Sequence, residues 1–149
     1  MHSFTSCLVH CVWSTKDREP LLTSDLRDRL WPYLGGIAKQ NQMKALAIGG
    51  ASDPVHVLLL SVPATLSVAK AMQLLKGNSS KWLRATFPKM HSFAWQEGYG
   101  AFSINVSGVD ATVVYIRNQA EHHRTRSFRH EYAAMLKKHG FAYDESMLV

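Results

Sequence analysis

The sequence predicts an α+β sandwich in which an antiparallel sheet carries helices on one face. Segments with strand-like and helix-like apolar periods follow one another in the order strand, helix, strand, strand, helix, strand, helix. The segment at 55–62 is nearly all apolar, which is typical of a central strand covered on both faces. The first six segments are those of the split βαβ, ferredoxin-like arrangement.

The first strand and first helix are predicted from composition and spacing. Residues 3–13 are rich in Thr, Val, Phe, Cys and Trp, which favour a strand. Ser24 is the predicted N-cap of a helix over 24–40, in which Leu and Ile recur at helical spacing. Pro32 and the Gly35–Gly36 pair lie inside that pattern, so we expect a kink or a break there.

Two strands and a long helix form the middle of the chain. A short strand is expected at 45–50 and the apolar central strand at 55–62. The spacing then predicts a helix over 66–85 with apolar residues inward and lysines outward. Gly77 within that helix indicates a bend or a close approach of another segment.

The last part of the sheet is predicted at 101–106, where apolar and polar residues alternate. Ser107 and Asp110 have the spacing of a capping box, which would open a helix running to about His123. A final amphipathic helix is predicted over 131–139.

Length and composition indicate one domain, residues 1–149, with a core at about 3–125 and a C-terminal helical tail at 126–149. Hydrophobic residues make up 46% of the chain, which excludes disorder. The sequence shows neither a signal segment nor an apolar run of about 18 residues. Cys7 and Cys11 would lie about 13 Å apart in a strand, too far for a disulfide. We expect a cytoplasmic protein without membrane association.

Positive charge is concentrated in two regions. The chain has 17 Lys and Arg against 11 Asp and Glu, a net charge of +6. No acidic residue occurs from Pro54 to Gln96, and a run of Arg and His follows at 117–130. A solvated lysine face is one interpretation, although such faces normally mix signs. Surfaces that follow nucleic-acid phosphates have this one-sided charge, which favours a nucleic-acid partner.

Three polar side chains share one flank of the helix after the last strand. Tyr115, Gln119 and His122 recur at helical spacing away from the apolar stripe, so a phenol, a carboxamide and an imidazole project together. From spacing alone, a Tyr ring that caps the edge of the core is the more common explanation.

Imidazoles elsewhere give weaker signals. His56 and Pro54 point to one face of the central strand, and a lone strand histidine is usually a core or edge residue. His10 lies in the first strand. The adjacent His122 and His123 diverge by about 100° on a helix, so they do not readily share one metal ion.

Five stretches in chain order carry a resemblance to a known family. They are VWSTKDREP at 12–20, GG at 49–50 leading into DPVHVLL at 53–59, LKGNSSKW at 75–82, FAWQEGYGAFS at 93–103 and YIRNQAEHHR at 115–124. With them the chain resembles the insertion-sequence-200-like single-strand DNA transposases, particularly the REP-associated tyrosine transposases of the HUH nuclease class. The resemblance covers about residues 3–145.

The resemblance implies the ferredoxin-like fold, a homodimer and a tyrosine nuclease. Tyr115 stands at the position of the family's nucleophile, which attacks a phosphodiester of hairpin-bearing single-stranded DNA. A 5′-phosphotyrosine forms and a 3′-hydroxyl leaves. The family's nucleophile helix can belong to either subunit. The family holds Mg or Mn with a His-hydrophobic-His pair, here 54–56, and with the Gln four residues after the Tyr, here Gln119.

The chain departs from the family at the metal site. Pro54 stands where the first His of the pair is expected, and proline has no side-chain ligand atom. His56 and Gln119 remain. Asp53 and His10 are the candidate substitutes, because oxygen suits Mg or Mn and the first and third strands neighbour each other in this fold.

Two functions follow from the resemblance. One is a metal-dependent transposase that cleaves and rejoins single-stranded DNA; the other is a DNA-binding family member with impaired catalysis. Tyr115 and Gln119 favour the enzyme, and Pro54 favours the binding protein. Either function would use the predicted DNA-binding residues, which are Lys76, Lys81, Arg84, Arg117, His122, His123 and Arg124.

Overall fold

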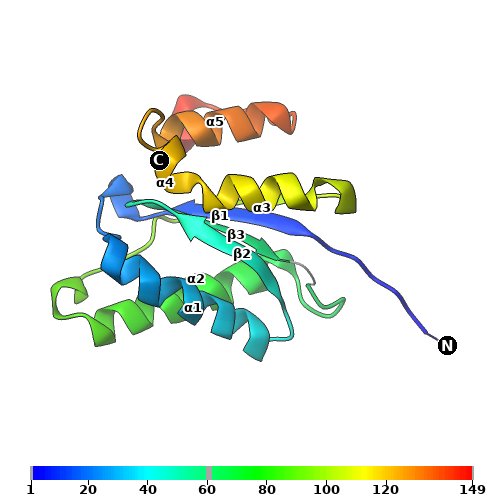
Figure 1. Cartoon of the computed structure of the whole chain (residues 1–149), viewed down its shortest axis with the longest axis horizontal. Helices are drawn as coiled ribbons and strands as arrows, with labels where there is room; N and C mark the ends of the chain where they lie inside the picture. Colours follow the sequence, from blue (N-terminus) through cyan, green and yellow to red (C-terminus); the bar gives the residue numbers. More distant parts are fainter. Residues whose placement is uncertain (1, 60–61, 149) are drawn as a thin grey trace.

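A computed structural model of the chain describes residues 2–59 and 62–148 (Figure 1). It contains a four-stranded antiparallel sheet with the strand order β2-β3-β1-β4. This order and the connecting helices are those of the predicted split βαβ, so the predicted fold class is confirmed. The strands are β1 (Val9–Ser14), β2 (Ala45–Gly50), β3 (Pro54–Leu59) and β4 (Gly100–Ser103).

Helices cover both faces of the sheet (Figure 1). The two crossover helices share one face, as predicted, and the helices that follow β4 in the chain lie on the opposite face. The first pair is α1 (Ser24–Gln40) and α2 (Val68–Thr86). The second layer is α3 (Val109–Arg117), α4 (Gln119–His122) and α5 (Phe128–Lys138). Short 3-10 helices occur at Lys16–Arg18, Pro88–Met90, Val106–Gly108 and Glu145–Met147.

The second helical layer has a physical cause in the strands. On β3, Val55 and Val57 are buried in the core beneath α1 and α2, while His56 between them is buried as well. On β2, Ala47 packs against Ile116 of α3. Both faces of the central strands therefore need a cover, and α3 to α5 supply it on the second face.

Several predicted boundaries are wrong. Residues 2–7 are exposed and lie outside β1, so the first strand begins later than the predicted 3–13. Helix α1 is capped by Thr23, whose side chain accepts from the Leu26 amide, and not by Ser24. It continues without a break through the exposed Pro32.

The predicted single helix after β4 is also wrong. Asn105 caps the 3-10 helix at Val106–Gly108, where its side chain accepts from the Gly108 amide. No side chain caps α3, so the predicted capping box at Ser107 is wrong. The helix is interrupted at Asn118, so that α4 starts as a separate turn. The break lies between Tyr115 and the imidazoles that follow it.

No helix within residues 2–59 and 62–148 combines the length and the apolar character needed to cross a bilayer.

Glycine has different roles at two positions. Gly49 of β2 lies directly under α3, and a Cβ there would overlap the backbone carbonyl oxygen of Ile116. A Cβ on Gly77 would meet nothing within 4 Å, and α2 is continuous there. The predicted bend or close approach at Gly77 is therefore absent, whereas Gly49 lets α3 approach the sheet.

These two glycines give a matched test of how α3 is seated. We expect Gly49→Ala to lower the free energy of unfolding by about 2–3 kcal/mol, because backbone cannot move aside like a flexible side chain. Gly77→Ala should raise it by about 0.5–1 kcal/mol through helix propensity. Chemical denaturation of both variants measures the two changes. Equal stability of Gly49→Ala and wild type would contradict the close approach of α3.

Candidate active site

The Tyr115 ring lies between the sheet and the helices that cover it. Its neighbour Ile116 is fully buried against β2, which fixes the last turn of α3 on the sheet. The ring centroid is 5.9 Å from that of His56 on β3, 6.3 Å from His10 on β1 and 4.8 Å from His122. The predicted nucleophile thus lies among three imidazoles of its own chain.

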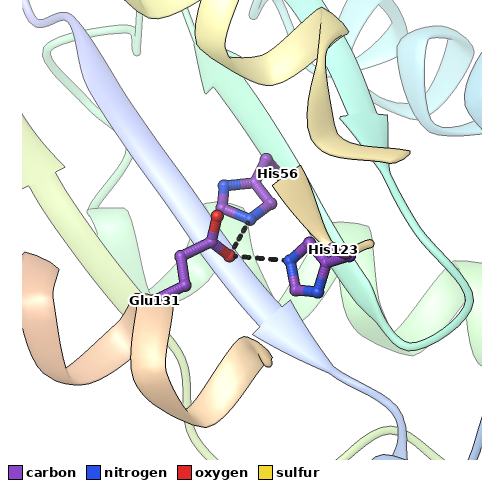
Figure 2. A group of neighbouring side chains, drawn as sticks. All are labelled: His56, His123 and Glu131. Carbon is purple, nitrogen blue, oxygen red and sulfur yellow. Dashed lines mark hydrogen bonds and ion pairs between the residues drawn. The ribbon is translucent and has the colours of Figure 1, made fainter. Parts of the chain in front are cut away.

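Glu131 of α5 connects these groups. Its side chain is only 2% exposed, and Oε1 accepts from His56 Nε2 at 2.9 Å and from His123 Nε2 at 3.2 Å (Figure 2). The other oxygen, Oε2, accepts a hydrogen bond from the Tyr115 hydroxyl. One buried carboxylate therefore contacts the Tyr115 hydroxyl through one oxygen and two imidazoles through the other.

Sequence reasoning missed Glu131. Its partners are distant along the chain, with His56 75 residues away. The available signal was its acidic charge directly after the Arg and His run at 117–130. An acidic residue on the buried side of an amphipathic helix needs partners, because an unpaired buried carboxylate is strongly unfavourable.

His10 orients His56 from the other side. The two residues come from the neighbouring strands β1 and β3, and His10 Nε2 shares a hydrogen bond of 2.9 Å with His56 Nδ1. Burial, and then the nearby His56, lower the pKa of His10 to about 3, so it is neutral at pH 7. This contact fixes the His56 ring with Nε2 directed at Glu131.

Gln119 has an unsatisfied atom. The side chain is fully buried, and its Nε2 donates to the Tyr115 carbonyl oxygen at 3.4 Å. Its Oε1 is buried and has no hydrogen-bond partner within the described residues. A buried carbonyl oxygen without a partner is uncommon and suits a hard cation as ligand.

The electrostatics hold Glu131 ionised and Tyr115 neutral. Burial would raise the pKa of Glu131, but hydrogen bonds from His123, His56 and Tyr115 outweigh it and keep that pKa well below its ordinary value. Burial, followed by the hydrogen bond and the charge of Glu131, raises the pKa of Tyr115 well above its ordinary value. At neutral pH the phenol is therefore protonated and its proton is directed at the carboxylate.

The structure places Asp53 and Pro54 at the edge of this group. Pro54 begins β3 opposite Ser14 of β1. The possible ligand atoms of His56, His123 and Glu131 all lie within 4.8 Å of one another. Asp53 is not part of this group. Burial raises the pKa of Asp53, and the nearby His123 opposes this by lowering it. Of the two candidate substitutes, His10 contacts His56 directly and Asp53 stays outside the cluster.

The predicted DNA-binding residues divide between two faces. Helix α2, which carries Lys76, Lys81 and Arg84, lies across the sheet from α3, the helix that carries Tyr115 (Figure 1). Lys76 Nζ donates to the carbonyl oxygens of Gln96 and Gly98, and Arg84 donates to that of Phe93, so both hold the 93–98 loop. The remaining four residues, Arg117, His122, His123 and Arg124, belong to the Tyr115 side.

A pocket of about 370 Å³ opens beside the Tyr115 ring. Glu131 lines it, and so do Arg126 and Lys138, which the sequence did not single out as site residues. The charge of Arg126 lowers the pKa of Tyr115, against the larger effects of burial and Glu131. The pocket therefore presents the Tyr115 hydroxyl next to cationic side chains.

Glu131 makes stability depend on pH in the acid range. Its folded-state pKa lies below the ordinary value of 4.5, so its contribution is complete above about pH 5 and is lost as the pH falls below that value. We expect the Tm of wild type to fall more steeply between about pH 5 and pH 3 than that of Glu131→Gln. Glu121→Gln, at an exposed carboxylate, should keep the wild-type slope. Parallel curves for wild type and Glu131→Gln would contradict this role.

Comparison with known proteins agrees with the predicted resemblance. Residues 3–119 match the family described as "Transposase IS200 like". A search of curated proteins found no significant match.

The crystal structure of a protein described as a transposase from Deinococcus radiodurans R1 is similar, with a TM-score of 0.64 and 26% identity over 80% of this chain and 95% of that chain. A REP-associated tyrosine transposase bound to a REP hairpin has a similar fold, with a TM-score of 0.58 and 11% identity over 99% of this chain and 76% of that chain. The chain belongs to the IS200-like transposase family.

Proposed function

We propose that this chain cleaves and rejoins hairpin-bearing single-stranded DNA through a covalent 5′-phosphotyrosine at Tyr115. One observation carries the proposal: the Tyr115 hydroxyl lies in a pocket with cationic side chains and donates to the buried Glu131 carboxylate. The family match includes Tyr115, His56 and Gln119. The similar structure with a bound REP hairpin supports a hairpin as the substrate of this chain.

The proposed step is a transesterification. Tyr115 Oη attacks the phosphorus, the bond from phosphorus to the 3′-oxygen breaks, and the leaving 3′-oxygen takes up a proton from solvent to become the 3′-hydroxyl. Glu131 Oε2 is hydrogen-bonded to the phenol and is the acceptor for its proton. Arg126 and Lys138 reduce the negative charge around the phosphate. Because the phosphotyrosine retains the bond energy, a second 3′-hydroxyl rejoins the strand by the reverse reaction.

A divalent cation, Mg or Mn, completes the proposed activity by stabilising charge on the phosphate. His56 Nε2 and Gln119 Oε1 are the family-position residues that would hold it. The unpartnered Gln119 oxygen supports this fit, since the described residues offer it no hydrogen bond.

The proposed assembly is a homodimer, as the family resemblance implies, and the proposed location is the cytoplasm. Within one chain the side chain of Tyr115 already contacts Glu131 and lies beside His56, which favours action in cis. Two basic faces on opposite sides of one sheet would suit a folded DNA hairpin that contacts more than one surface, or one that spans two subunits.

A second candidate function is DNA binding without cleavage. The observation that favours it is Pro54, at the position of the family's first metal-binding His. A site with one ligand fewer holds a hard cation more weakly. The basic residues that would contact DNA do not depend on that ligand.

A covalent-adduct assay tests the proposed chemistry. Wild type is incubated with Mn²⁺ and a single-stranded hairpin DNA that is labelled at one end or at the other. We expect it to give a protein–DNA adduct that resists denaturant. Tyr115→Phe should form less than about a hundredth of it, because phenylalanine has no nucleophilic oxygen. Tyr33→Phe is the matched control, since Tyr33 stacks on Trp82 of α2 away from the site, and should give the wild-type amount.

The assay also separates the two functions. If wild type binds the hairpin in a gel-shift experiment but forms no adduct, and Pro54→His forms one, the chain is a binding protein with a degraded site. An adduct that persists in Tyr115→Phe would show that another residue is the nucleophile.

A further inference from the structure

We propose that His56, His123 and Glu131 form a divalent transition-metal site, in which the α5 carboxylate and a second imidazole compensate for the ligand missing at Pro54. The inference deepens the proposed function and uses a ligand set that differs from the His-hydrophobic-His pair. His123 and Glu131 both lie beyond the residues that match the family, 3–119.

The ligand atoms already have the spacing of a coordination shell. His56 Nε2 and His123 Nε2 lie 2.9 Å and 3.2 Å from Glu131 Oε1, and all three atoms lie within 4.8 Å of one another. Neighbouring ligands of an ion with bonds of about 2.1 Å are about 3.0–3.4 Å apart. Small side-chain shifts would let an ion replace the hydrogen bonds shown in Figure 2.

Backbone structure holds each ligand in place. His56 lies in the middle of the paired strand β3. The His123 amide donates to the carbonyl oxygen of Gln119, which ends the α4 turn. Glu131 is in the first turn of α5, where its amide donates to the carbonyl oxygen of Ser127. Three separate elements thus converge on one point.

The surrounding residues resemble the support that metal ligands need. His10 contacts the second ring nitrogen of His56 and fixes its orientation. The Gln119 side chain is fully buried beside Tyr115, and its unpartnered Oε1 offers a further oxygen ligand. Of these supporting groups, the Gln119 amide oxygen is the one that has no hydrogen-bond partner within the described residues.

The donor set predicts which ion binds. Two imidazole nitrogens and one carboxylate oxygen suit Mn²⁺, Co²⁺ or Zn²⁺, whereas Mg²⁺ prefers oxygen ligands and water. The site should therefore select Mn²⁺ over Mg²⁺.

Direct metal titration of the full chain tests the site without DNA. We expect the chelator-stripped protein to bind one Mn²⁺ per chain by calorimetry, at least about tenfold more tightly than Mg²⁺. Glu131→Gln and His123→Gln should each weaken Mn²⁺ binding by at least about tenfold, with the fold of each variant checked by circular dichroism. Glu121→Gln replaces an exposed carboxylate and should stay within about twofold of wild type.

Two results of the titration would contradict the proposed metal site. No Mn²⁺ binding by wild type would mean that His56, His123 and Glu131 form a hydrogen-bonded cluster only. Unchanged affinity in folded Glu131→Gln, or in His123→Gln if the first variant unfolds, would place the ion elsewhere.

Tyr115→Phe distinguishes this inference from the proposed function. It should bind Mn²⁺ within about threefold of wild type while forming no DNA adduct. If wild type binds Mn²⁺ as expected but forms no DNA adduct, the proposed function is overturned and the metal site stands. If wild type forms the adduct but the ligand variants keep their Mn²⁺ affinity, the metal site is overturned and the proposed function stands.

Discussion

The structure around Tyr115 depends on one buried charge. Glu131 lies between the sheet and the second helical layer with 2% of its side chain exposed. An isolated carboxylate in that position would be very unfavourable, so its stability rests on the hydrogen bonds from His56, His123 and Tyr115. Because those donors come from β3, the turn after α4, and α3, the same contacts tie three elements to α5. Removing the carboxylate should affect the fold and the site together.

The contact with Glu131 also keeps the half-buried Tyr115 phenol protonated. The carboxylate favours the neutral phenol, and burial acts in the same direction. In the proposed reaction, positive charge from a bound cation or from the nearby Arg126 would offset the charge of Glu131 and favour loss of the phenol proton.

Much of the fold could be predicted from the sequence, because strand and helix periods are local. The apolar β3 and the amphipathic α2 show this directly. The i, i+4 spacing of Tyr115 and Gln119 likewise predicted neighbouring side chains across the break at Asn118. Glu131 could not be placed, since its partner His56 is 75 residues away and only the tertiary fold joins them. The missed break at Asn118 and the cap at Asn105 depended on local hydrogen bonds that composition does not show.

The central claim is that Glu131 replaces the ligand that Pro54 cannot supply. Anomalous diffraction from crystals of the full chain grown with Mn²⁺ tests it most directly. The account predicts one strong peak about 2.1–2.2 Å from His56 Nε2, His123 Nε2 and Glu131 Oε1. A peak bound by His56 and Asp53 with Glu131 turned away, or no peak among these residues, would contradict it.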